Sequence, residues 1–201
     1  MTAEPTAAKP PARIVPAATI LMVRDGADGI EVFMVKRHHQ IDFASGALVF
    51  PGGKLAPGDS DPRLRGLIDG ADGYSDDELA LAACAIREAF EESGILLARR
   101  SGNKELLSGD EVAALDAHRV PLNEERLGLA DFLQANGLRL AADRLIRFAR
   151  WITPDMMPKR FDTWFFIAEA PEGQLGAHDG YESVDSVWVT PAQAIAEPDR
   201  W

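Results

Sequence analysis

The chain has 201 residues, of which 46% are hydrophobic and 26% charged, a balance that fits one globular domain with a sizeable core. Its net charge of −11 argues against nonspecific binding to nucleic acid or to an anionic membrane, because either would need a basic face. An anionic substrate would need a divalent cation to screen the repulsion. The single cysteine, Cys84, excludes an intrachain disulfide and suits a reducing compartment, and its helical surroundings predict a core position.

The N-terminal residues 1–16 ("MTAEPTAAKPPARIVP") have no apolar run after their charges, so we expect a flexible arm and not a signal peptide. Residues 17–201 are expected to form a single domain. No segment approaches the roughly 18 to 20 apolar residues of a membrane span. The sequence therefore favours a soluble, cytoplasmic protein.

The first half of the domain shows strand and turn patterns. Two apolar runs, residues 17–23 and 30–37, flank the turn-forming stretch "RDGADG" and predict a β-hairpin. Residues 46–50 ("GALVF") predict a short strand that ends at Pro51. Residues 56–74 are rich in Gly, Pro and Asp and predict a loop.

The next segment has the signals of a helix at both ends. Ser75 and Glu78 form a capping-box pattern, and Gly94 supplies the stop. Between these ends, apolar residues recur at helical spacing and predict a buried stripe. The stripe consists of Leu79, Ala83, Ile86 and Phe90.

Two further helices are predicted inside a helical insert that spans residues 100–144. The first, residues 109–117, begins at a second capping-box pattern. The second, residues 124–135, takes Asn123 as its N-cap and ends before Gly137.

Strands resume after the insert, at residues 145–152, 163–170 and 186–189. A short helix then begins after Thr190, with proline at its first position. The chain stops at Trp201, an exposed-looking aromatic residue. We expect either that the chain is cut short or that this tail packs on a partner, and a homodimer is left open.

The stretch "REAFEESGI" (residues 87–95) combines three glutamates with an arginine at the end of the predicted helix. Steps of about 100° per residue place Glu88, Glu91 and Glu92 on one face, opposite the apolar stripe. The helix is therefore expected to have a buried back and a carboxylate front.

These acids are badly placed for helix stability. They repel one another, and the helix dipole disfavours anions at a C-terminus by roughly 0.3 to 1 kcal/mol each. Arg87, four residues before Glu91, can neutralise that residue but not all three. A hard cation such as Mg²⁺ or Mn²⁺ would explain the placement, because it takes carboxylate oxygens and leaves room for phosphate. The alternative is a solvated end of an acidic helix.

With the upstream "VFPGGKL", this stretch resembles the signature of Nudix hydrolases. That signature runs glycine, five residues, Glu, seven residues, then Arg-Glu, an apolar residue, any residue, Glu-Glu, any residue, Gly and an apolar residue. Residues 87–95 match its second half. From Gly53, five residues lead to Asp59 in place of Glu, and 27 residues (60–86) follow where the signature has seven. An uninterrupted signature beginning at Gly73 would place Leu79 where Glu belongs, so the interrupted form fits better.

Such an interrupted signature is similar to the Nudix branch that includes the peroxisomal coenzyme A diphosphatases and bacterial relatives. Further segments fit this branch: "ARWITP" at 149–154, "RFDTWFF" at 160–166 and "ESVDSVWVTPAQAI" at 182–195. Branch members often have Arg where this chain has Trp164, so the anion contact that the resemblance would imply at this position is not carried over to Trp164. It implies an α/β fold, the Nudix α/β/α sandwich, with a central mixed β-sheet.

The resemblance also implies roles for individual residues. Glu88, Glu91 and Glu92 would bind the metal with the backbone carbonyl of Gly53, while Arg87 would orient a glutamate. The proposed catalytic residues are Glu91, Glu92, Arg87 and Glu182, with Glu182 either a metal ligand or general base, or else a surface acid. Lys36, Arg37 and Arg160, with Lys159, could contact phosphates, or could be solvated charges. Trp151, Phe161, Phe165 and Phe166 are expected in the core in preference to stacking on adenine.

The implied activity is Mg²⁺- or Mn²⁺-dependent cleavage of the pyrophosphate in a small-molecule nucleoside diphosphate derivative, with coenzyme A or acyl-CoA as the expected substrate. Alternatives are ADP-ribose, dinucleotides or nucleoside triphosphates, or a binding module of the same fold without catalysis. The intact glutamates disfavour the binding module, since their loss usually marks such modules.

Overall fold

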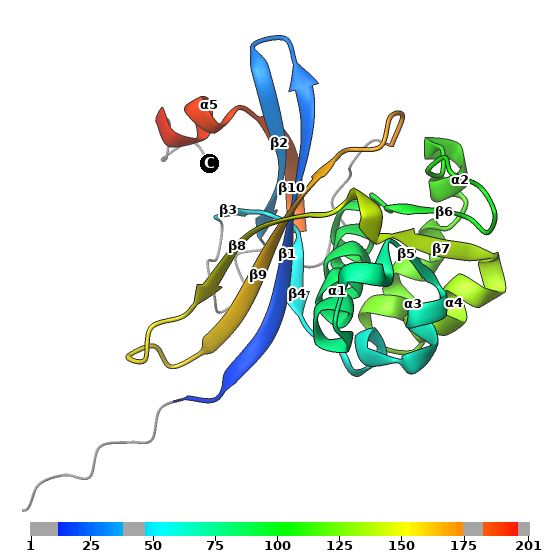
Figure 1. Ribbon diagram of the computed structural model, residues 1–201. Coiled ribbons are helices and arrows are strands. Elements are labelled where there is room, and N and C mark those ends of the chain that lie inside the picture. The colour runs from blue at the N-terminus through cyan, green and yellow to red at the C-terminus, as the bar shows by residue number, and fades with distance from the viewer. Residues whose placement is uncertain (1–11, 38–46, 175–182, 197–201) are drawn as a thin grey trace, which may run out of the picture.

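The computed structural model describes residues 12–37, 47–174 and 183–196, shown in Figure 1. Glu182 and Trp201 lie outside the described residues. The main element is a seven-stranded sheet with the order β10-β2-β1-β9-β8, in which β3 pairs with β2 and β4 pairs with β1. Its strands are β1 (Ile14–Gly26), β2 (Gly29–Arg37), β3 (Leu48–Val49), β4 (Gly52–Lys54), β8 (Ile146–Ile152), β9 (Arg160–Glu169) and β10 (Ser183–Val189).

The sheet is mixed, as expected. β1 runs parallel to β9, whereas the other strand pairs of this sheet are antiparallel. The predicted hairpin is confirmed, because β1 and β2 pair up to Gly26 and Gly29, and Gly29 has a φ of 119° that favours glycine. β1 begins at Ile14, three residues before the expected boundary. The α/β fold class with a central mixed sheet is therefore confirmed.

The helical insert is more broken than expected, and it includes a strand. A three-stranded sheet with the order β5-β7-β6 joins β5 (Ile68–Asp69), β7 (Leu138–Ala141) and β6 (Ala98–Arg100). The helices beside it are α2 (Gly109–Ala113), η4 (Asp116–His118), α3 (Arg119–Asn123), α4 (Leu129–Asn136) and η5 (Ala142–Arg144).

The prediction that Asn123 caps a helix over residues 124–135 was wrong. Asn123 ends α3, and the next helix, α4, follows Gly128. α3 accommodates Pro121 because this residue lies in the first helical turn, where its missing N–H leaves no hydrogen bond unmade. The predicted end at Gly137 is confirmed, with a φ of 62°.

The predicted loop over residues 56–74 also contains regular structure. It forms three short 3₁₀ helices, η1 (Pro57–Ser60), η2 (Pro62–Gly66) and η3 (Ala71–Gly73), together with β5. Proline begins the first two of these helices, a position that needs no N–H donor. The segment is therefore ordered by short helical turns, which its Gly-, Pro- and Asp-rich composition did not predict.

Helix α1 (Asp76–Ser93) has the predicted ends. Ser75 and Glu78 form the capping box, and Gly94 adopts a φ of 68°. The carboxylate front, however, is not solvated: the helix is buried on all sides from Leu79 to Ser93. The reason is its position between the main sheet and the insert, where it contacts β1 and β4 on one side and α3 on another (Figure 1).

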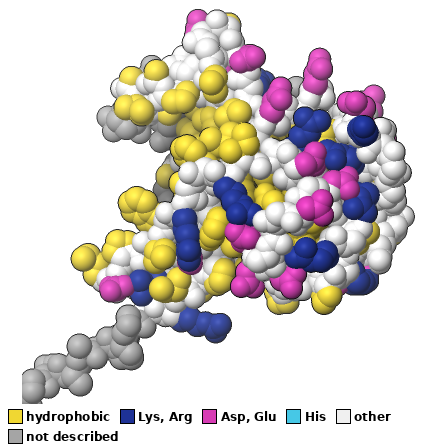
Figure 2. All heavy atoms as spheres, in the orientation of Figure 1, with side chains coloured by type: hydrophobic (Ala, Val, Ile, Leu, Met, Phe, Trp, Pro, Cys, Tyr) yellow, Lys and Arg dark blue, Asp and Glu magenta, His cyan; other side chains and the backbone are white. Residues whose placement is uncertain are grey.

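The short helix α5 (Pro191–Ala196) begins as predicted, because Thr190 and Gln193 exchange two hydrogen bonds of 3.2 Å. Figure 2 shows hydrophobic side chains spread over the sheet and α5, and charged side chains concentrated on the insert. The most exposed large hydrophobic side chains include Ile146, Phe148 and Trp151 of β8 and Met156 after it. No helix among the described residues is long and apolar enough to cross a membrane.

Candidate active site

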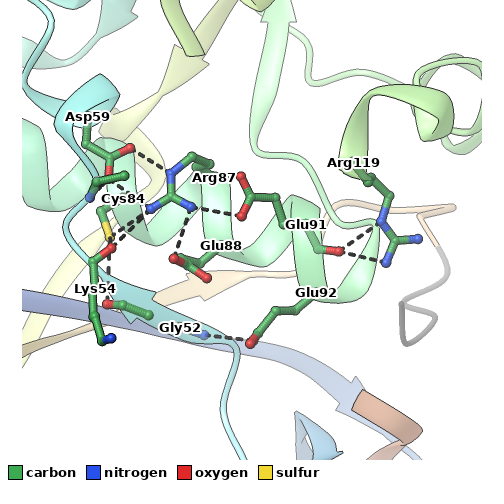
Figure 3. Close-up of polar contacts among 11 residues, drawn as sticks. Gly52, Lys54, Asp59, Cys84, Arg87, Glu88, Glu91, Glu92 and Arg119 are labelled. Atoms are coloured by element: carbon green, nitrogen blue, oxygen red, sulfur yellow. Dashed lines mark hydrogen bonds and ion pairs between the residues drawn. The ribbon is translucent and has the colours of Figure 1, made fainter. Parts of the chain in front are cut away.

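Arg87 lies at the centre of a buried cluster of acids on α1 and η1 (Figure 3). Its Nε and Nη2 donate to the two carboxylate oxygens of Asp59 at 2.8 and 2.9 Å. Its Nη1 pairs with Glu91 at 2.8 Å and with Glu88 at 3.0 Å. Its Nη2 also donates to the carbonyl oxygen of Lys54 at 3.2 Å. One guanidinium group therefore holds three carboxylates and one strand in place.

The charges in this cluster depend on one another. Burial alone would lower the pKa of Arg87, but the hydrogen bonds and charges of Asp59, Glu88 and Glu91 raise it above its ordinary value. Arg87 therefore stays protonated. Asp59 is 2% exposed and also accepts a hydrogen bond of 2.8 Å from the amide of Ala56, so the ordered turn of η1 orients it toward Arg87.

Glu91 has unusual electrostatic surroundings. It is 3% exposed, and this burial raises its pKa to about 8 in spite of the nearby Arg87, with Glu88 adding to the increase. Its Oε2 accepts from Arg87, whereas its buried Oε1 has no hydrogen-bond partner. Such an oxygen costs free energy unless something binds it.

Strand β4 brings the glycines against the glutamates. The amide of Gly52 donates to Glu92 Oε2 at 3.0 Å, which anchors Glu92 to the sheet. A Cβ atom on Gly53 would lie 2.3 Å from Glu88 Oε1, so the carboxylate of Glu88 occupies the space that any side chain at this position would need. The backbone carbonyl of Gly53 lies 3.8 Å from the thiol of Cys84.

The donor set suits a hard divalent cation. Within residues 12–37, 47–174 and 183–196, no group of three His, Cys, Asp or Glu side chains converges as a preformed metal site, because Glu88 and Glu91 turn to Arg87 and Glu92 turns to Gly52. Even so, the available ligands are carboxylate oxygens, which Mg²⁺ and Mn²⁺ prefer. The unpartnered Oε1 of Glu91 suits a cation ligand, whereas Glu88 and Glu92 would have to turn from Arg87 and Gly52 to join it.

A cavity of about 840 Å³ opens beside the cluster. Arg87, Glu88 and Glu91 line one part of it. The sheet, with Phe50 just after β3, supplies another part, which is largely apolar and includes Ala17, Met34, Leu48, Val49, Phe161 and Phe165. The cavity therefore joins an acidic end that could hold a cation to an apolar wall.

The family model described as the NUDT19 Nudix domain matches residues 69–199, which include all of "REAFEESGI". The chain belongs to this Nudix family. Its Gly53 and Asp59 precede the matched residues, and the structure brings Gly53 against Glu88 and Asp59 against Arg87. The interrupted Nudix signature thus becomes continuous in space.

Individual relatives agree with this assignment. The chain is 29% identical to the Caenorhabditis elegans protein called putative nudix hydrolase 7, over 83% of this chain and 48% of that protein. It is also 29% identical to the Xenopus laevis acyl-coenzyme A diphosphatase NUDT19, over 83% of this chain and 54% of that protein. The chain thus spans about half the length of these curated relatives.

A solved structure supports the Nudix fold. The crystal structure of a NUDIX hydrolase from Alicyclobacillus acidocaldarius superposes with a TM-score of 0.75 at 29% sequence identity. The alignment covers 94% of this chain and 84% of that one.

The residues of this Nudix domain that were predicted to contact phosphate are spread over different parts of the structure. Lys159 lines the cavity, whereas Lys36 and Arg160 are not among the described residues that do so. Arg160 donates to the carbonyl oxygen of Thr153 at 3.0 Å and pairs with Asp155 at 2.5 Å, both within the β8–β9 hairpin. Arg37 ends β2, and its side chain, like the whole of Glu182, is outside the described part of the chain.

The aromatic residues divide into three groups. Phe166 is 1% exposed and belongs to the core, as expected. Phe161 and Phe165 are half-buried and line the cavity. Trp151 was wrongly expected in the core: it is 65% exposed, because it lies on β8, an edge strand on which every residue is exposed. Cys84 is fully buried, as predicted, and burial raises the pKa of its thiol well above the ordinary value.

Sequence reasoning missed the contribution of the insert to the Nudix site. Asn123 and Glu125 line the same cavity as Glu88 and Glu91, and Arg119 binds the end of α1. No spacing rule connects these residues to the glutamates. Asp59 was noticed only as a departure from the Nudix signature, although its contact with Arg87 makes it part of the site.

The close approach at Gly53 predicts the effect of a small substitution. Gly53→Ala should lower kcat by about 100-fold, because displacing a site carboxylate by about 1 Å is enough for a loss of that size. Stability should change little, since the displaced group is the end of a flexible side chain. Steady-state kinetics and thermal unfolding test this, with Gly58→Ala as the control, because its nearest atom would lie 3.9 Å away. Normal turnover of the Gly53 variant would show that Glu88 need not occupy this position.

Proposed function

We propose that the chain is a Mg²⁺- or Mn²⁺-dependent hydrolase that cleaves the pyrophosphate of a nucleoside diphosphate derivative, with coenzyme A or acyl-CoA as its substrate. The observation that carries this proposal is the buried, unpartnered Oε1 of Glu91 beside Glu88 and Arg87 at the wall of a cavity. An acidic cluster of this kind would repel a pyrophosphate unless a cation lay between them.

The chain's own residues would prepare the site for this chemistry. A divalent cation, when bound, would neutralise the negative charge on the phosphate oxygens. Glu88, Glu91 and Glu92 would hold it, and Arg87 would keep the first two in reach, since it already contacts both. The Gly52 amide would fix Glu92, and the raised pKa of Glu91 means that cation binding would displace a proton near neutral pH. Glu182 stays a predicted metal ligand or general base.

The substrate proposal draws on the cavity and on one relative. The apolar wall formed by Phe161 and Phe165 beside the acidic end suits a substrate that carries a large group next to its pyrophosphate. The Xenopus laevis relative is named an acyl-coenzyme A diphosphatase. These observations favour coenzyme A derivatives over ADP-ribose, dinucleotides or nucleoside triphosphates, which stay as alternatives.

A substrate panel tests the proposal. The protein would be incubated with Mg²⁺ or Mn²⁺ and with each of these compounds, and the products identified by mass spectrometry. Release of 3′,5′-ADP and 4′-phosphopantetheine from coenzyme A is the expected result, and EDTA should abolish it. Turnover of only the other compounds would change the substrate class. A complete lack of turnover by the metal-loaded protein would favour a binding module.

The homodimer and the cytoplasmic location stay predictions. Sedimentation equilibrium of the purified chain tests the first, with a mass of 21.8 kDa expected for a monomer and twice that mass for a dimer.

A further inference from the structure

The last turn of α1 lacks a positive charge of its own. It carries Glu91 and Glu92 but no basic residue, at a position where the helix dipole disfavours anions. Its final carbonyl groups also have no partner within the helix. A cationic side chain from elsewhere in the chain would solve both problems.

Arg119, at the start of α3 in the insert, supplies that side chain. Its Nε and Nη2 donate to the backbone carbonyl of Glu91 at 3.1 and 3.0 Å (Figure 3). Its Nη1 pairs with Asp116 at 3.0 Å, and its side chain is 13% exposed. The guanidinium is thus held by η4 on one side while it caps the catalytic helix on the other.

Gly94 lets this contact form. A Cβ atom at this position would lie 3.3 Å from Nη1 of Arg119, a tight approach. Glycine also permits the φ of 68° that ends the helix. The residue that stops α1 therefore also leaves room for the arginine that caps it.

The same short helix reaches the cavity. Asn123 at the end of α3, and Glu125 just beyond it, line the cavity with Glu88 and Glu91. Glu125 has a φ of 54°, in the left-handed region that usually holds glycine after a helix and that costs other residues about 1 to 2 kcal/mol. The insert therefore keeps a strained turn at the wall of the site, as functional segments often do.

We propose that Arg119 is a positioning residue of the active site, which sets the last turn of α1 so that Glu91 and Glu92 can bind a divalent cation. This inference rests on the proposed function, because it assumes that these glutamates bind a cation. Sites of this kind need their ligands held within about 0.5 Å. The helical insert thereby acts on the metal site through the backbone of Glu91, without any contact to the cation itself.

The test measures Mn²⁺ binding directly, by isothermal titration calorimetry with MnCl₂ and protein alone. Arg119→Met should weaken Mn²⁺ binding by roughly 10- to 100-fold, the usual effect of losing a residue that supports metal ligands. In the turnover assay at saturating Mn²⁺, kcat should fall while KM for the substrate stays near the wild-type value. Arg119→Lys keeps the charge and one donor, so its Mn²⁺ affinity should lie between those of Arg119→Met and the wild type.

Arg100→Met is a matched control, because Arg100 also lies in the insert and donates to a helix-terminal carbonyl, that of Asn136 in α4, at 3.0 Å. This variant should leave Mn²⁺ affinity unchanged. If the wild type binds Mn²⁺ and both Arg119 variants bind it equally well, the positioning role is overturned and the proposed function stands. If the wild type neither binds Mn²⁺ nor turns over any compound, both proposals fail together.

Discussion

Glu91→Gln is expected to lower kcat by about 100-fold or more, the lower bound for losing a positioned catalytic carboxylate. Gln is the same size as Glu and keeps an oxygen that can accept a hydrogen bond from Arg87. In the wild type, Nη1 of Arg87 lies 2.8 Å from Oε2 of Glu91. It removes the negative charge that a divalent cation would need. Because burial raises the pKa of Glu91 to about 8, this side chain is largely protonated at neutral pH without a cation, so replacing it by neutral Gln should not destabilise the fold.

Two measurements separate lost chemistry from lost structure. Thermal unfolding of the Glu91 variant should stay within about 4 °C of the wild type, the shift that about 1 kcal/mol causes in a chain of this size. Glu105→Gln, at an exposed position in the insert, should leave kcat unchanged. Wild-type turnover by the Glu91 variant would remove this residue from the catalytic machinery.

Asp59→Asn should cause the largest loss of stability, about 3 kcal/mol in the free energy of unfolding. Asp59 is fully buried and makes a two-pronged contact with Arg87, and removing one partner of a buried ion pair costs about 3 to 5 kcal/mol. The lower end is expected, since Glu88 and Glu91 still contact Arg87 after the substitution. Urea denaturation followed by circular dichroism measures the change.

The control for this prediction is an exposed ion pair. Asp76 pairs with Arg65 at 2.6 Å, but its side chain is 91% exposed. Asp76→Asn should therefore cost less than about 1 kcal/mol. Equal losses from the Asp59 and Asp76 substitutions would mean that the buried pair does not connect η1 to α1 as strongly as its geometry indicates.

Local patterns predicted the elements whose signals lie close together in the sequence. The capping box at Ser75, the stop at Gly94 and the hairpin before Gly29 are all confirmed, because each depends on contacts between near neighbours. Two predictions were wrong: that residues 56–74 form only a loop, and that Asn123 is the N-cap of a helix. In both cases the sequence contains short helices with proline in the first turn, and over residues 56–74 a composition rich in Gly, Pro and Asp hid them.

The sequence by itself determined that Glu88, Glu91 and Glu92 share one face of a helix, since helical geometry requires it. It also matched them to the second half of the Nudix signature. Only the tertiary structure decided their surroundings. Asp59 reaches Arg87 across 28 positions, and Arg119 reaches Glu91 across the same separation. Contacts of this range depend on how the sheet and the insert enclose α1, and that packing turned an apparently solvated acidic face into a buried site.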